Sequence, residues 1–109
     1  MPKITLDEGL AKLPRPDGKR FADMLHHGTL DVEIYAPRGA DPQQPHSRDE
    51  LYVVMAGRGT FVDGDERYPF APGDVLFVPA RRVHRFEQFT DDLAVWVMFW
   101  GPEGGEAGG

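Results

Sequence analysis

The chain has 109 residues, of which 40% are hydrophobic and 28% are charged, a balance typical of one folded globular domain. Its net charge of −6 argues against nucleic acid as a partner, and the absence of cysteine excludes disulfides, thiolate metal ligands and cysteine nucleophiles. The longest apolar run, at residues 93–100, is far shorter than the ~20 residues of a membrane helix, and no targeting segment is visible. We therefore expect a cytoplasmic protein without a membrane partner.

The N-terminal part of the chain predicts a short helix followed by a break. Thr5 and Glu8 have the spacing of a capping box, which predicts a helix over residues 6–12. The segment 13–18 contains two prolines and a glycine and ends that helix. We assign residues 1–27 to an N-terminal helix and arm.

From residue 28 onward the pattern is that of short β-strands separated by glycine and proline. Leu30, Val32 and Ile34 alternate with polar or amphipathic residues, which is typical of a half-buried strand. A tight hairpin is predicted at residues 63–65, and further strands are predicted over 51–55, 60–62, 75–78, 83–89 and 93–100. This pattern predicts a sandwich or barrel over 28–100, followed by a flexible glycine-rich tail over 101–109.

The last predicted strand, residues 93–100, is apolar on both faces. A monomer of this size rarely buries both faces of a strand, so we expect one face to form a homodimer contact. The alternative is a central strand that the N-terminal segment covers.

The candidate metal ligands are two histidines and one glutamate: His46, His84 and Glu50. On an extended strand, Gln44 and His46 point to one face with their Cα atoms ~6.6 Å apart, close enough to share an ion. Glu50 is too far from His46 on a straight strand, so the two can meet only if the chain reverses at residues 47–49, which are turn-forming.

Tyr52 and Arg82 are the candidate catalytic side chains. Strand alternation places Tyr52 on the face of Glu50, where its phenol could supply a proton or a hydrogen bond to an oxyanion. Arg82 shares the face of His84 by the same rule, and its guanidinium could clamp a substrate carboxylate. The alternatives are that Tyr52 is pocket wall and that Arg82 pairs with surface acids.

The spacing of these residues resembles the two sequence motifs of the cupin family. The first motif has a His-x-His pair, three residues, a glutamate, six residues and a glycine. The second has a glycine, five residues, Pro-x-Gly, two residues, a histidine, three residues and an asparagine. Six residues of this chain match in register across the two motifs: His46, Glu50, Gly57, Gly73, Pro79 and His84.

The chain departs from the family pattern at three positions. Gln44 stands where the family has its first histidine, and it could ligate a metal weakly or only orient a bound water. Arg81 replaces a turn glycine, and Gln88 replaces an asparagine.

The resemblance implies an all-β, cupin-type β-barrel or jelly roll with a short N-terminal helix. It also implies one divalent transition metal (Fe, Mn, Ni or Zn), held by His46, Glu50 and His84, with Gln44 as a further ligand. The alternative for this cluster is a hydrogen-bonded polar group without metal.

The function implied by the resemblance is that of a metal-binding small cupin. Such a protein would act on or bind a small organic molecule, as a metal-dependent dioxygenase, lyase or isomerase. The alternative is a non-catalytic module that binds or senses a small ligand. A metal-free structural dimer is the least favoured hypothesis.

Overall fold

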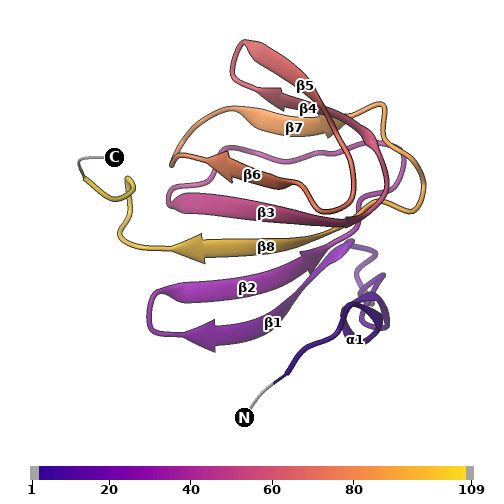
Figure 1. Ribbon diagram of the computed structural model, residues 1–109. Coiled ribbons are helices and arrows are strands. Elements are labelled where there is room, and N and C mark those ends of the chain that lie inside the picture. Colours follow the sequence, from indigo (N-terminus) through magenta and orange to yellow (C-terminus); the bar gives the residue numbers. More distant parts are fainter. Residues whose placement is uncertain (1–2, 108–109) are drawn as a thin grey trace.

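The computed structural model describes residues 3–107, which form one short helix and eight β-strands (Figure 1). The elements are α1 (Leu6–Leu10), β1 (Phe21–His27), β2 (Leu30–Tyr35), β3 (Asp49–Ala56), β4 (Gly59–Asp63), β5 (Glu66–Phe70), β6 (Val75–Val78), β7 (His84–Glu87) and β8 (Ala94–Trp100). The larger antiparallel sheet has the order β1-β2-β8-β3-β6, and the smaller has the order β5-β4-β7. The predicted all-β fold class with a short N-terminal helix is confirmed.

The protein core lies between the two sheets. Tyr52 of β3 packs on Phe61 of β4 and on Phe86 of β7, with ring centroids 5.9 and 5.0 Å apart. All three side chains are at most 1% exposed. Because each buried aromatic ring contributes about 1.5–3 kcal/mol, this cluster is a main source of the attraction between the sheets.

The capping box and the first helix are confirmed, although α1 ends at Leu10, earlier than predicted. The Thr5 side chain accepts a hydrogen bond from the Glu8 backbone N–H at 3.1 Å. Gly9 lies so close to β2 and β8 that a Cβ atom there would be 3.1 Å from Ile34 and 3.4 Å from Trp96. The N-terminal segment therefore covers part of the second apolar face of β8.

Strand β1 extends the sheet into the segment that the sequence assigns to an arm. It pairs with β2, with Phe21 opposite Tyr35 and Asp23 opposite Glu33, and a bulge follows Asp23. The sequence of β1 lacks apolar alternation, because a strand at the edge of a sheet beside a cavity need not bury a regular apolar face.

Strand β2 is half-buried as predicted, but its polar face is the one that looks into the barrel. Glu33 and Tyr35 line the internal cavity, whereas Ile34 lies under α1 on the outer face. The alternation therefore identifies the strand, and the interior of this barrel accepts polar residues because it contains a cavity.

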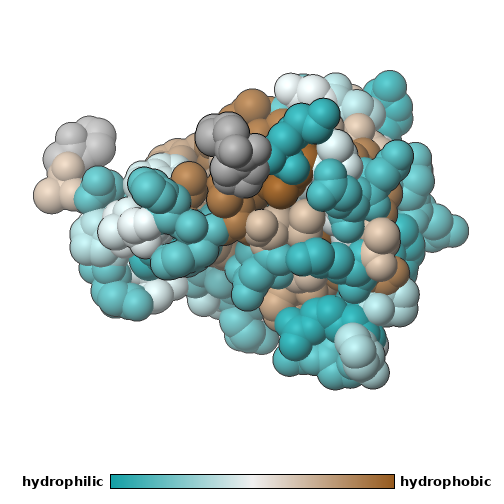
Figure 2. All heavy atoms as spheres, turned by 90° about the horizontal axis from the view of Figure 1, so that it is seen from below, coloured by the Kyte–Doolittle hydropathy of each residue, from teal (hydrophilic) through white to brown (hydrophobic). Residues whose placement is uncertain are grey.

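The outer face of β3, β6 and β8 carries exposed apolar side chains. Met55, Val75 and Phe77 are 40%, 59% and 52% exposed, and Phe77 packs on Trp100 with ring centroids 6.1 Å apart. Figure 2, which shows the molecule from below, has hydrophobic residues gathered between hydrophilic ones. The homodimer expected from β8 stays a prediction. No helix in residues 3–107 has the length and hydrophobicity to cross a membrane.

The described part of the C-terminal tail, up to residue 107, contacts the barrel. The Gly104 N–H donates to the backbone carbonyl oxygen of Ser47 at 2.6 Å, and the Glu106 N–H donates to Asp49 Oδ2 at 2.9 Å. The Ala80 N–H donates to the other oxygen of Asp49 at 3.0 Å. Asp49 thus joins the tail to the chain segments beside the predicted site.

Candidate metal centre

His46, Glu50 and His84 converge on one point inside the barrel. One ligand atom from each lies within 4.8 Å of the others. His46 Nδ1 and His84 Nε2 are each 3.1 Å from Glu50 Oε1. His46 belongs to the loop before β3, Glu50 to β3 and His84 to β7, so the cluster joins the two sheets. The predicted chain reversal between His46 and Glu50 is present, with bends at residues 47–48.

Burial and charge make this cluster electrostatically unusual. Glu50 is 1% exposed and His84 is 4% exposed. Burial alone raises the pKa of Glu50, but the hydrogen bonds and charges of His46 and His84 outweigh it and hold the pKa below its ordinary value. Burial lowers the pKa of His84, yet its bonds to Glu50 and to the Arg82 backbone bring the net shift upward.

The donor set fits a metal ion. Glu50 Oε2 is buried and has no hydrogen-bond partner among the described residues. Such an orphaned carboxylate oxygen costs ~1–3 kcal/mol, and ligation of a cation would satisfy it. Two imidazoles and a carboxylate are a ligand set that divalent transition metals accept.

The backbone fixes the orientation of the second histidine. His84 Nδ1 lies 2.9 Å from the Arg82 carbonyl oxygen, and because a carbonyl only accepts, Nδ1 carries a hydrogen. His84 Nε2 is then directed at Glu50, the arrangement seen when a histidine ligates a metal through its other nitrogen. The first histidine, His46, packs against Phe99 with ring centroids 4.9 Å apart.

Two departures from the family pattern fall on backbone positions that favour glycine or asparagine. Arg81 has φ +67° and Gln88 has φ +51°, both in the left-handed region. The Arg81 N–H donates to the His46 backbone oxygen at 2.5 Å. Arg81 thus joins the loops that carry the two histidines, although its backbone conformation is strained for a residue with a side chain.

Tyr52 faces the cluster as predicted. It is fully buried, its hydroxyl donates to Gln43 Oε1 at 2.7 Å, and it lies 3.0 Å from His84 Nε2. Burial, together with the charge of Glu50, raises the pKa of Tyr52 well above its ordinary value. The phenol therefore stays protonated at neutral pH and can act as a hydrogen-bond donor.

Gln44, the predicted fourth ligand, is exposed, and its neighbour Gln43 reaches the site instead. Residues 41–48 form no strand, so the alternation that places Gln44 beside His46 does not apply there. Asp41 holds this loop by accepting hydrogen bonds from Gln43 Nε2 at 2.7 Å and from the Phe86 N–H at 2.8 Å.

Arg82 also lies elsewhere than the predicted substrate clamp. Its Nε donates to Asp63 Oδ1 at 2.5 Å, and it is not among the residues that line the cavity. It precedes β7, so the alternation from His84 does not reach it. The cations that do line the cavity are Lys19, Arg20 and Arg38. The sequence carries no signal for these three, because they come from the arm and a loop rather than from a motif.

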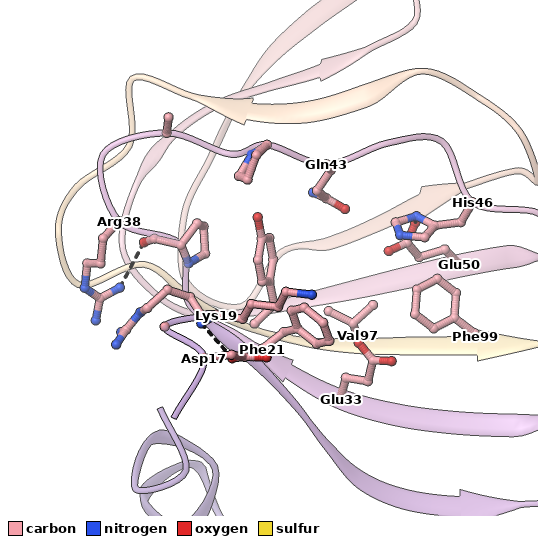
Figure 3. A pocket seen from close by; sticks show the side chains of 16 residues that line it. Asp17, Lys19, Phe21, Glu33, Arg38, Gln43, His46, Glu50, Val97 and Phe99 are labelled. Atoms are coloured by element: carbon pink, nitrogen blue, oxygen red, sulfur yellow. Dashed lines mark hydrogen bonds and ion pairs between the residues drawn. The ribbon is translucent and has the colours of Figure 1, made fainter. Parts of the chain in front are cut away.

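A cavity of about 640 Å³ opens beside the cluster (Figure 3). His46, Glu50 and Phe99 lie at one end and Arg38 at the other, with Phe21 between them. The volume is that of a small-molecule site.

Comparisons with known proteins agree with this geometry. The family model described as Cupin domain matches residues 31–100. An uncharacterized protein of Streptomyces coelicolor is 36% identical over 105 residues, which cover 94% of this chain and 99% of that protein. The HTH-type transcriptional activator RhaS of Yersinia pestis is 36% identical over 73 residues, 66% of this chain but 26% of the activator.

Solved structures show the same fold. A Cupin 2 conserved barrel domain protein of Salinispora arenicola has a TM-score of 0.70 at 23% identity, covering 93% of this chain and 89% of that chain. A Thermus thermophilus protein has a TM-score of 0.69 at 20% identity, covering 94% and 100%. The two-sheet barrel, the register of the motif residues and the family match lead to one conclusion: this chain belongs to the cupin family.

Proposed function

We propose that this cupin holds one divalent transition metal through His46, Glu50 and His84, and that it binds or acts on a small organic molecule in the adjoining cavity. The observation that carries the proposal is the convergence of three ligand atoms within 4.8 Å. The ligand set suits Fe, Mn, Ni or Zn. An ion of this kind supplies Lewis-acid chemistry or, for iron, the activation of dioxygen.

The unpaired oxygen of Glu50 favours metal ligation over a purely hydrogen-bonded cluster. Among the described residues, both histidines approach Oε1 and the buried Oε2 has no hydrogen-bond partner. A cluster selected only for hydrogen bonding would be expected to satisfy both oxygens. A cation near Oε2 removes this deficit.

The residues around the cluster support chemistry on an organic ligand. Val97 and Phe99 form an apolar wall of the cavity, which excludes water from one side of a bound molecule. The Tyr52 hydroxyl lies beside His84 and holds a proton at neutral pH, so it can donate to an oxygen that gains negative charge. We propose a metal-dependent dioxygenase, lyase or isomerase, since these groups suit each of the three reactions.

A non-catalytic binding module is the second candidate. The similarity to the RhaS activator supports it, since that protein is named as a transcriptional regulator. Here the same cavity would store or sense a ligand without turnover.

Elemental analysis of the purified protein tests the metal site. We expect near-stoichiometric metal in the wild type and loss of most of it in both His46→Ala and His84→Ala. His26→Ala is the matched control, because the His26 side chain is 73% exposed and, within residues 3–107, bonds only to Asp31. Circular dichroism checks that each variant is folded. Full occupancy retained in both site variants would end the proposal.

Oxygen uptake distinguishes the two candidate functions. The Fe(II)-loaded protein is tested with a panel of phenols and thiols. Uptake that depends on both the metal and an added compound supports a dioxygenase. Tight ligand binding that needs no metal, without turnover of any compound, supports the binding module.

A further inference from the structure

Glu33 is an acidic residue of the cavity wall that metal binding does not use. It lies on β2 opposite Val97 of β8, and Val97 lies opposite Tyr52 of β3. Two strand spacings therefore separate Glu33 from Tyr52, about 10 Å between Cα atoms. Glu33 lines the same cavity as His46 and Glu50, but it is not part of their cluster.

A second acid lies beside the Glu33 carboxylate on the neighbouring strand. Asp23 stands opposite it on β1, just before the bulge in that strand. None of the ion pairs among residues 3–107 involves Glu33 or Asp23. Bulges are common next to functional sites, where they direct a side chain. The charge of Asp23 therefore disfavours the ionised form of Glu33.

The environment supports a carboxyl group that exchanges its proton near neutral pH. Burial, and then the charge of and hydrogen bond to Asp23, raise the pKa of Glu33 to about 7. The charge of His46 acts in the opposite direction, and that of Glu50 adds to the rise. The residue of the neighbouring strand β8 that lies opposite Glu33 is the apolar Val97, which adds no charge.

The cations of the cavity disfavour a positively charged ligand. Lys19, Arg20 and Arg38 line it, and none of them takes part in an ion pair within residues 3–107. Figure 3 shows Lys19 extending along the cavity toward the end that holds His46. The partly ionised carboxyl group of Glu33 in turn disfavours an anionic group at that point. A ligand group that contacts Glu33 is therefore neutral and meets a carboxyl oxygen with a hydrogen-bond donor.

We propose that Glu33 is the specificity-determining residue of this cavity and that it selects molecules with a hydroxyl group, which donates a hydrogen bond to its carboxyl oxygen. Phe21 and Val97 flank it and would contact the apolar body of such a molecule. The proposal rests on the ligand-binding part of the proposed function. It requires no metal, because Glu33 lies outside the cluster.

Phenol and anisole are matched probes for this proposal, because the methyl ether lacks only the hydroxyl hydrogen. Ligand-detected NMR measures the affinity of each for the full chain, kept metal-free with a chelator. We expect phenol to bind about tenfold more tightly than anisole, as for one hydrogen bond to a partly ionised carboxyl group. Equal affinities, or no binding of either probe, would overturn the proposal.

Variants assign the preference to Glu33. Glu33→Leu should bind phenol and anisole equally, and Glu33→Gln, which keeps the shape of the side chain, should reduce the preference at least threefold. Glu66→Gln is the control, because Glu66 is an exposed acid at the hairpin between β4 and β5. A preference that survives in both Glu33 variants contradicts the proposal. The probes are tested without metal, so the binding result does not depend on the outcome of the elemental analysis. The two proposals can therefore fail separately.

Discussion

Gly57 and Gly73 provide a sharp test of how the cupin motif glycines stabilise the barrel. Their φ angles are +93° and +94°, so replacement by alanine strains the backbone similarly at both positions. A Cβ atom at Gly57 would lie 2.6 Å from Leu93 Cα and 2.9 Å from Leu93 N. A Cβ atom at Gly73 would meet no atom within 4 Å.

The magnitudes follow from these contacts. The left-handed backbone costs about 1–2 kcal/mol in either alanine variant. In Gly57→Ala the backbone of the fully buried Leu93 must also move, which adds about 1–3 kcal/mol as for an overpacked core. We therefore expect the free energy of unfolding to fall by about 2–5 kcal/mol in Gly57→Ala and by about 1–2 kcal/mol in Gly73→Ala. The larger loss is a substantial part of the ~5–15 kcal/mol typical of one domain.

Urea denaturation followed by circular dichroism measures both variants. The two should differ in midpoint with similar slopes, since the surface exposed on unfolding is nearly unchanged. Equal destabilisation of the two variants would refute the argument, because it would show that the close approach of Gly57 to Leu93 contributes nothing.

Three further predictions concern the strained turn, the cavity acid and the outer face. Arg81→Gly should raise the free energy of unfolding by up to about 1 kcal/mol in urea denaturation, because φ +67° is unstrained for glycine; a loss of stability would contradict this. The pKa of Glu33 is about 7 in the folded chain against 4.5 ordinarily, so the folded state binds a proton there more tightly than the unfolded state does. The stability that this proton contributes is therefore lost as pH rises from about 4.5 through about 7. The free energy of unfolding of Glu33→Gln, taken relative to wild type, should therefore rise by about 1–2 kcal/mol between pH 5 and pH 8, after allowance for solvent exposure. Thermal unfolding at the two pH values measures this difference, and no relative rise would count against the raised pKa. If the proposed homodimer forms through the outer face, Phe77→Asp, at a side chain 52% exposed, should shift light-scattering mass from twice 12.2 kDa toward 12.2 kDa, and an unchanged mass would place any dimer contact elsewhere.

The sequence was sufficient for most of the strands, although not for β1, and for the three candidate metal ligands, because turn residues and alternation predict strands and the two family motifs predict the ligands. The hairpin at residues 63–65 and the strand that contains Tyr52 follow from turn residues and alternation, and the structure has them as β4–β5 and β3. His46, Glu50 and His84 converge because the family motif encodes their positions in the barrel. The positive φ of Arg81 explains why the motif has glycine there, a reason that only coordinates show.

Alternation predicts the direction of a side chain only within a strand, so it failed in the loop where Gln43 rather than Gln44 reaches Tyr52. It failed likewise at Arg82, which precedes β7 and bonds to Asp63. The inward direction of Glu33 could not be predicted either, because a polar residue on a strand normally faces solvent. Tertiary structure alone reverses that expectation here, since closing the two sheets around a cavity makes the barrel interior a place where a carboxyl group can meet a ligand.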